Sequence, residues 1–218
     1  MAKIKKHDFV EIEYTGRTKD DNAVFDTTDK EIAKKEGIYN EDSTYGPMIV
    51  CVGEGQVIKG MDNYLEKAEA PSEATLEIIP EEGFGRKDSK LVRMIPAKKF
   101  AEQNIMAAPG LQVNIDGLIG AIKTVGGGRV LVDFNHPLAS QQLNYSLKVN
   151  RIISEDSKKV ESYLKIFFGH DISVEENEGT ITAATHYDIP EEVATQVKEK
   201  IRKIIPTVKE IIFTKKNK

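Results

Sequence analysis

The chain has 218 residues, of which 39% are hydrophobic and 30% charged, a composition typical of soluble globular proteins. Its net charge is −4, with 31 basic and 35 acidic residues interspersed, which argues against a dedicated nucleic-acid-binding protein. No apolar run approaches the roughly 20 residues that cross a bilayer, and the basic segment 1–6 leads into His7 and Asp8 rather than an apolar signal sequence, so we expect a cytoplasmic protein that does not enter a membrane.

Alternating apolar and polar residues predict a half-buried strand over residues 9–16, with Val10, Ile12 and Tyr14 on one face. Shorter signals of the same kind continue along the next part of the chain. We expect strands at 24–28, 48–52 and 74–80, one or two helical turns at 30–35 that Gly37 ends, and a helix at 61–68 that Pro71 ends.

A glycine-rich turn follows the apolar strand at 48–52 and could at first sight be a phosphate loop. A dinucleotide fingerprint that starts at Gly53 would need its third glycine where Ile58 stands. A Walker loop would need lysine and then serine or threonine directly after Gly60, where the chain has Met61 and Asp62. The turn instead presents apolar side chains, so we expect an apolar ligand, and nucleotide binding is the alternative that a thermal shift with ATP or NAD would test.

Residues 86–90 form a charged segment, which we interpret as a linker. Candidate strands follow near 91–95, 111–115, 117–124 and 129–134. The triple glycine at 126–128 stands between the last two strands, which favours a tight turn over a phosphate loop. A turn at 135–139 then precedes the clearest alternating strand of the chain, at 143–152.

The polar junction 154–158 is a candidate domain boundary. Beyond it, the apolar spacing predicts an amphipathic helix that ends at Gly169, strands near 172–176 and 179–185, a helix that begins near Pro190 and ends before Pro206, and a last strand at 208–213. An α-β-β-α-β unit of roughly 60 residues buries only a marginal core. We therefore expect this unit to be helped by a partner surface, with a homodimer as one possibility and further client binding as another.

Short motifs occur along the chain in a fixed order: Tyr14-Thr15-Gly16, Phe25-Asp26, the run from Gly53 to Met61, Gly83-Phe84-Gly85 and Leu143-Asn144-Tyr145. In order and spacing they resemble the FK506-binding proteins (FKBPs), a family of peptidyl-prolyl cis-trans isomerases. The insertion after Gly85 resembles the SlyD type, in which a flap of the catalytic domain is expanded into an insert-in-flap chaperone domain. The additional C-terminal segment resembles the long-chain archaeal members.

The resemblance implies an α+β fold, with an antiparallel half-barrel sheet wrapped on a short helix. A small β-rich domain would be inserted into it, and an α-β-β-α-β domain would follow it. The implied catalytic domain is discontinuous and covers 1–85 and 135–153. The insert would cover 86–134 and the C-terminal domain 155–218.

The resemblance also implies a proline-binding pocket. The matching positions are Tyr14, Phe25, Asp26, Met48, Val57, Ile58, Met61, Phe84, Leu138 and Tyr145. By this match Phe25, Val57, Ile58, Met61 and Tyr145 hold the prolyl ring, the Ile58 amide with Tyr14 or Asp26 orients the peptide, and Phe84 and Leu138 limit water at the rim. Taken one by one, an aromatic residue on an alternating strand is usually core, and Asp26 could simply cap the turn at Thr27.

Three positions depart from the common family pattern. Met61 stands where tryptophan is frequent, Met48 where phenylalanine is frequent, and Phe84 where a tyrosine hydroxyl is frequent. Because methionine adapts to irregular shapes, we expect a softer pocket that binds proline more readily than the macrolide that names the family. The alternative function is a non-catalytic holdase chaperone that keeps the fold.

The insert carries more apolar residues than a segment of roughly 50 residues can bury. With the resemblance, we predict a groove for unfolded or proline-containing client polypeptides, formed by Leu91, Met94, Ile95, Phe100, Met106 and Leu118. The alternative is that these residues pack the insert's own core.

Metal binding and cofactors are not expected. The histidines at 7, 136, 170 and 186 are scattered, without ligand spacing, and Cys51 is the only cysteine, which also excludes an internal disulfide.

Overall fold

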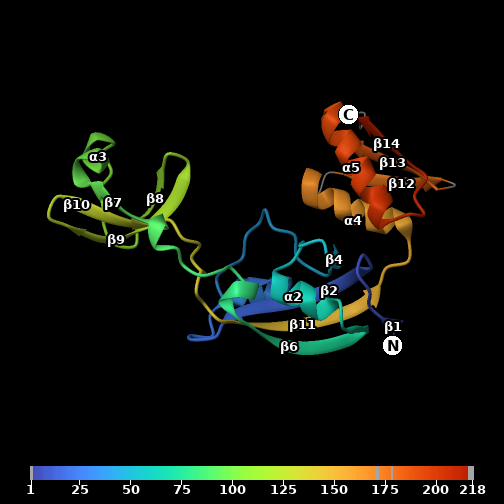
Figure 1. The fold of residues 1–218 in the computed structure, drawn as a ribbon, viewed down its shortest axis with the longest axis horizontal. Coiled ribbons are helices and arrows are strands. Elements are labelled where there is room, and N and C mark those ends of the chain that lie inside the picture. Colours follow the sequence, from blue (N-terminus) through green and yellow to red (C-terminus); the bar gives the residue numbers. More distant parts are fainter. Residues whose placement is uncertain (1, 170–171, 178, 216–218) are drawn as a thin grey trace. The chain divides into compact units, whose positions relative to one another are not determined.

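The computed structural model describes residues 2–169, 172–177 and 179–215, which form two compact units. The chain up to Ile78 and from Leu143 onward makes the first unit, and Ile79–Gln142 makes the second (Figure 1). The first unit is therefore discontinuous. The second unit contains the predicted insert 86–134 and also takes in the turns on both sides of it.

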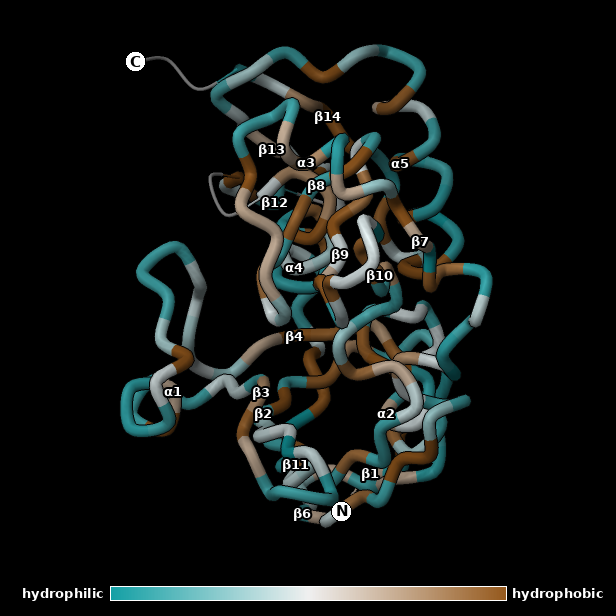
Figure 2. Tube along the Cα trace, turned by 90° about the vertical axis from the view of Figure 1, so that its left-hand side faces the viewer, coloured by the Kyte–Doolittle hydropathy of each residue, from teal (hydrophilic) through white to brown (hydrophobic). Residues whose placement is uncertain are grey.

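An antiparallel five-stranded sheet forms the centre of the first unit. Strands β3 (Val24–Thr27), β2 (Phe9–Thr18), β11 (Leu143–Ile152) and β6 (Ser72–Ile78) lie side by side in this order, and β4 (Met48–Cys51) also pairs with β2. Figure 2 shows the hydrophobic run along β4. Because β3 pairs with one end of β2 and β4 with the other, β2 positions both strands.

Helix α2 (Lys59–Leu65) buries Met61 and Leu65 and packs beside β6. At Gly60 a Cβ atom would lie 2.9 Å from Ile78 Cγ2, so glycine allows this close approach. The prediction that this helix extends to Ala68 was wrong. The Ile4 amide donates to the Ala68 carbonyl at 3.0 Å, and β1 (Ala2–Lys3) pairs with β5 (Glu69–Ala70), which draws the chain out of the helix.

Helix α1 (Lys30–Lys35) follows β3, and its N-terminus is capped by Asp29. The Asp29 carboxylate accepts from the amides of Glu31 at 2.8 Å and Ile32 at 3.0 Å. Among the helices that the structure describes, none is long and apolar enough to cross a membrane.

The second unit contains a four-stranded antiparallel sheet in the order β7 (Val92–Pro96), β10 (Arg129–Asp133), β9 (Leu118–Gly126) and β8 (Gln112–Ile115). Single 3-10 turns at Pro80–Glu82 and Ser89–Leu91 lead into it. Gly127 and Gly128 have φ values of 57° and 72° and join β9 to β10, which confirms the predicted tight turn. Helix α3 (Ala97–Glu102), which the sequence did not predict, places Phe100 in the core of this unit.

The C-terminal segment has the predicted α-β-β-α-β order. It consists of α4 (Asp156–Phe168), β12 (Ser173–Asn177), β13 (Thr180–Thr185), α5 (Glu191–Ile204) and β14 (Glu210–Lys215). Strand β13 pairs antiparallel with β12 and parallel with β14. The hydrophobic core of this segment includes Phe9, Cys51 and Ile153 from the sheet region, so the segment belongs to the first compact unit.

Candidate active site

An aromatic cluster lies where β3, β2 and β11 meet. The Tyr14 hydroxyl donates to Asp26 Oδ2 at 2.9 Å. The ring centroid of Tyr145 lies 5.8 Å from that of Tyr14 and 5.7 Å from that of Phe25, the latter in an edge-on arrangement. The structure therefore brings together four of the predicted site residues.

Gly16 makes this cluster possible. It pairs with Asp26 across β3 and with Tyr145 across β11. A Cβ atom here would lie 2.8 Å from Phe25 Cζ and 2.9 Å from Tyr145 Cε1, distances that require the rings to move. This role of Gly16 was not predicted, although a glycine inside an alternating strand is a signal for close approach of other groups.

Burial sets the protonation of the two tyrosines. It raises the pKa of Tyr14, and the neighbouring Asp26 carboxylate raises it further. Burial likewise raises the pKa of Tyr145, again with a smaller contribution from Asp26. Both hydroxyls therefore stay protonated, and Tyr14 remains a hydrogen-bond donor.

A groove of about 1050 Å³ opens beside this cluster. Its lining includes Tyr14, Phe25 and Asp26, together with Met48 of β4 and residues of the loop at 38–47. In that loop the rings of Tyr39 and Tyr45 stack at 5.4 Å, and the Tyr45 hydroxyl accepts from the Asn40 amide at 3.0 Å. A second cavity, of about 580 Å³, lies along β2, β6 and β11 and shares only Tyr14 of the cluster.

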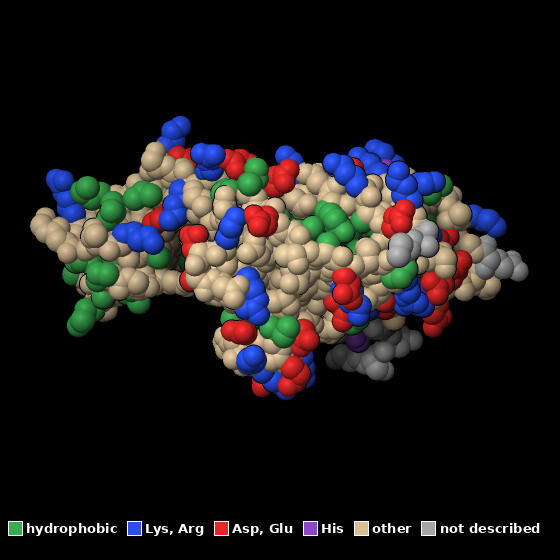
Figure 3. Space-filling model, turned by 90° about the horizontal axis from the view of Figure 1, so that it is seen from below, with side chains coloured by type: hydrophobic (Ala, Val, Ile, Leu, Met, Phe, Trp, Pro, Cys, Tyr) green, Lys and Arg blue, Asp and Glu red, His purple; other side chains and the backbone are tan. Residues whose placement is uncertain are grey.

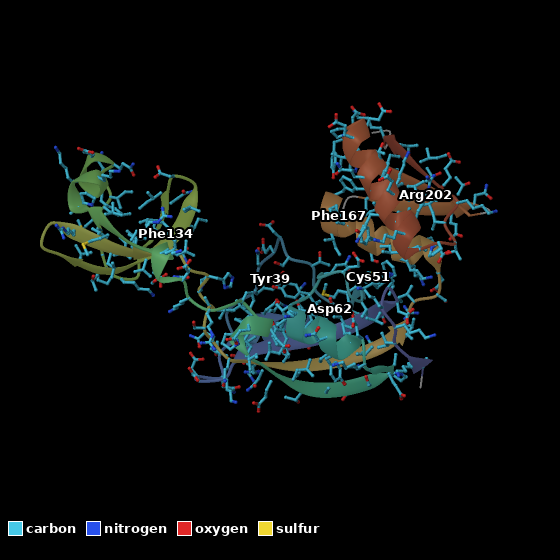
Figure 4. The ribbon with its side chains drawn as sticks, in the orientation of Figure 1. Tyr39, Cys51, Asp62, Phe134, Phe167 and Arg202 are labelled. Atoms are coloured by element: carbon cyan, nitrogen blue, oxygen red, sulfur yellow. The ribbon has the colours of Figure 1, made fainter. Side chains whose placement is uncertain are left out.

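The glycine turn before α2 uses its own backbone amides. Gly53 and Gly55 have φ values of 81° and 66°, and their amides donate to the Asp62 carboxylate at 2.8 and 3.2 Å. Figure 4 shows Asp62 on α2 and Cys51 at the end of β4. Because an internal carboxylate occupies the position that a phosphate would take, the turn is not a phosphate cradle.

Val57 and Ile58 are half-buried at the start of α2, whereas Met61 is 1% exposed. These three residues do not line the groove. Among the residues that the structure describes, none accepts a hydrogen bond from the Ile58 amide. Met61 is a core residue of α2 and presents almost no surface.

Phe84 and Leu138 lie in the second unit, where both are half-buried. The Phe84 ring stacks on His136, with centroids 4.3 Å apart and planes 1° from parallel. The sequence did not predict this contact, although His136 lies in the predicted turn at 135–139.

The apolar side chains of the second unit separate into two groups. Phe100 is buried with Val113, Ile122, Val130 and Val132, and Ile95 packs against them. Assigning Phe100 to a client surface was therefore wrong, because it fills the unit's core. Ile95 is partly buried against this core, and its assignment stays a prediction. Leu91 is half-buried.

The second group is exposed. Met94 is 60%, Met106 89% and Leu118 44% exposed. Ile119, which is 67% exposed, and Val125, which is 43% exposed, both on β9, belong to the same exposed group. Figure 3 shows hydrophobic side chains gathered over the outer part of this unit.

Among the described residues, no group of three or more histidine, cysteine, aspartate or glutamate side chains is placed so that it could hold a metal ion.

Comparison with known proteins agrees with this geometry. The family described as "FKBP-type peptidyl-prolyl cis-trans isomerase" matches residues 1–105, and the one described as "FKBP26, IF domain" matches residues 93–138. A short-type peptidyl-prolyl cis-trans isomerase of Methanocaldococcus jannaschii is 33% identical over 155 residues, which are 71% of this chain and 98% of that protein.

Bacterial relatives match over a shorter part of the chain. A probable FKBP-type 16 kDa isomerase of Pseudomonas fluorescens is 33% identical over 50% of this chain and 75% of its own length. The SlyD isomerase of Yersinia pestis is 29% identical over 55% of this chain and 63% of its own length.

The motifs, the aromatic cluster around Gly16 and the match along almost the whole length of an archaeal relative lead to one assignment. The chain belongs to the FKBP-type peptidyl-prolyl cis-trans isomerases, with an insert of the kind described for FKBP26.

Proposed function

We propose that this isomerase acts on X-Pro bonds in unfolded or partly folded proteins, and that the second unit holds these clients during catalysis. The observation that carries the proposal is the exposed group Met94, Met106 and Ile119. The core of the unit is filled by other residues, so these side chains are left for contacts with another chain. Methionine suits such a surface, because its flexible thioether adapts to many sequences.

The reaction itself needs no nucleophile. Rotation about a peptide bond faces about 18–20 kcal/mol, because resonance keeps the amide planar, and the uncatalysed X-Pro reaction takes roughly 10–100 s. Water stabilises the polar planar form of the amide, so the barrier falls when the amide moves out of water. It falls further when the site binds the twisted amide better than the planar one. No bond is formed or broken.

The cluster around Gly16 offers what this reaction requires. Phe25, with the buried Tyr145 behind it, supplies an apolar surface for the prolyl ring. The Tyr14–Asp26 pair supplies polar groups that can fix the peptide while its amide twists. The Ile58 amide belongs to a residue that does not line this groove, and it is assigned to the same role on the family match alone. We assign Tyr14, Asp26 and Ile58 to orientation and Phe25 to ring binding.

The proposal is tested by separating the two activities. In the double variant Met106→Ser with Ile119→Ser, isomerisation of a short prolyl peptide should be unchanged. Catalysis of a proline-limited protein refolding reaction should fall about tenfold or more, since each lost apolar contact is worth about 1.5 kcal/mol. The variant Asp26→Ala should lower both rates, about tenfold to a hundredfold, because it removes a hydrogen bond to a charged group.

The matched control is Val193→Ser with Ile212→Ser, which removes two side chains that are 40% and 41% exposed in the C-terminal segment. It should leave both assays unchanged. If the insert variant catalyses refolding as well as the unaltered protein does, the holding role is wrong. If Asp26→Ala keeps full activity on the short peptide, the assignment of the site is wrong.

A further inference from the structure

Helix α4 lines the catalytic groove with one continuous face. Its residues in the groove are Lys158, Glu161, Ser162, Lys165 and Ile166. Their spacing is i, i+3, i+4, i+7 and i+8, which is one side of an α-helix. We call this set the groove face of α4. Such regular spacing shows that a whole helix side, rather than an isolated residue, borders the groove.

The opposite side of α4 fixes this face in place. Val160, Tyr163 and Leu164 are buried in the core that includes Phe9 and Cys51. Ile49 of β4 packs against the same core and also lines the groove. The groove face and the catalytic strands are therefore joined through one packed core.

An ion pair adds a second connection between the C-terminal segment and the turn before α2. Lys200 Nζ of α5 lies 2.5 Å from Glu54 Oε2, and the other oxygen of that carboxylate lies 3.2 Å from His7 Nε2. Glu54 thus links the glycine turn, the N-terminal segment and α5.

The charges along this part of the groove are largely paired. Lys165 lies 2.8 Å from Glu161, Lys158 lies 2.9 Å from Glu155, and Arg151 lies 3.0 Å from Glu11. Ile166 stands among them as an apolar side chain that is 49% exposed. A surface of paired charges around an apolar contact suits a neutral, partly apolar chain better than a strongly charged ligand.

We propose that the groove face of α4 is a subsite for the residues of the client polypeptide that flank the proline, with Ile166 as its apolar contact. This rests on the proposed function, since it takes a polypeptide as substrate. The proposal is supported by the lining of the groove, which includes Ile166 as well as the Tyr14–Asp26 pair. At about 1050 Å³ it lies just above the usual range for sites that enclose a whole drug-sized ligand, so it has room for several residues besides the prolyl ring. Ile166 acts as a specificity-determining residue.

The test compares two substrates with the same central sequence. A peptide of about four residues spans at most about 14 Å, whereas one of about ten residues reaches up to about 35 Å. In the full-length variant Ile166→Ser, KM for the longer peptide with apolar flanks should rise about fivefold with kcat unchanged. The short peptide should keep its kinetics, and Ile166→Leu should restore the low KM.

Ile212→Ser is the matched control, because it makes the same substitution at an isoleucine that is 41% exposed and does not line the groove. It should change neither substrate. A second variant, Ser162→Phe, fills the groove at α4 and should raise KM for the longer peptide alone.

The subsite is refuted if KM for the longer peptide stays unchanged in Ile166→Ser and Ser162→Phe. It is also refuted if the short peptide is impaired equally, or if Ile212→Ser has the same effect as Ile166→Ser. Failure of the proposed holding role would look different. The insert variant would then catalyse protein refolding as well as the unaltered protein does, while the peptide-length effect at α4 persists.

Discussion

Tyr14, Gly16 and Asp26 show how a single strand pairing creates the polar part of the site. Pairing of β2 with β3 places Asp26 opposite Gly16, within reach of the Tyr14 hydroxyl at 2.9 Å. The absent side chain of Gly16 leaves space for the rings of Phe25 and Tyr145. The donor and the acceptor thus depend on the β2–β3 register, and the apolar wall depends also on the β2–β11 register.

The raised pKa of Tyr14 predicts the pH dependence of catalysis. Burial and the Asp26 carboxylate both disfavour the phenolate, so the hydroxyl keeps its proton at pH values where a free tyrosine loses it. The value of kcat/KM on a short peptide should therefore show no inflection at about pH 10, where an unperturbed tyrosine is half ionised. Tyr14→Phe should have a lower rate and the same flat alkaline profile. An inflection there in the unaltered protein that is absent from Tyr14→Phe would contradict this prediction.

At the scale of elements, the turn that joins β4 to α2 is closed by a side chain from the helix. The carboxylate of Asp62, in the first turn of α2, accepts from the amides of Gly53 and Gly55. A negative charge in the first helical turn also interacts favourably with the helix dipole. The turn therefore fixes the start of α2 and with it the position of Ile58.

Removing this acceptor should destabilise the protein. Asp62→Ala leaves two amides without their partner and should lower the free energy of unfolding by about 1–3 kcal/mol, measured by urea denaturation. Asp62→Asn keeps one acceptor oxygen and should lose less. Equal stability of Asp62→Ala and the unaltered protein would show that the carboxylate is not needed.

ATP or NAD should give no thermal shift with the unaltered protein, since the amides are occupied.

At the scale of the whole molecule, the C-terminal segment completes its core with residues of the sheet region. Phe9, Cys51 and Ile153 lie in one hydrophobic cluster with residues of α4, β13 and α5. The marginal size of this segment led us to expect that it needs a partner surface. The same chain supplies such a surface, so the size argument no longer requires a dimer, and the homodimer stays a prediction.

The reactivity of the Cys51 thiol tests whether the C-terminal segment covers this core. It is 1% exposed, and its burial raises the pKa of the thiol to about 12, so the native protein should resist thiol reagents at neutral pH. A chain that ends at Ser154 should react much faster, because the cover of Cys51 is gone. Both chains should react fully in denaturant. Native protection of Cys51 in the shortened chain would show that the segment does not cover it.

Local sequence patterns predicted several of the strands and turns. Alternation predicted β2, β6 and β11, and the triple glycine predicted the turn between β9 and β10, since both signals act over a few neighbouring residues. The motifs were sufficient to indicate the family. The end of α2 at Leu65 was missed, because its cause is pairing with β1, about 65 residues away in the chain.

The sequence by itself determined the order of most elements, the family and the identity of the aromatic and acidic residues around the pocket, but not β1, β5 or α3. The tertiary structure alone decided which apolar residues of the insert are core and which are exposed, as Phe100 and Met106 show. It also decided that Gly16 makes room for two rings, that the Asp62 carboxylate accepts from the amides of the glycine turn and that α4 borders the groove beside the aromatic cluster. The physical reason is that burial and contact depend on which distant segments pack together, whereas periodicity and turn chemistry depend only on neighbours along the chain.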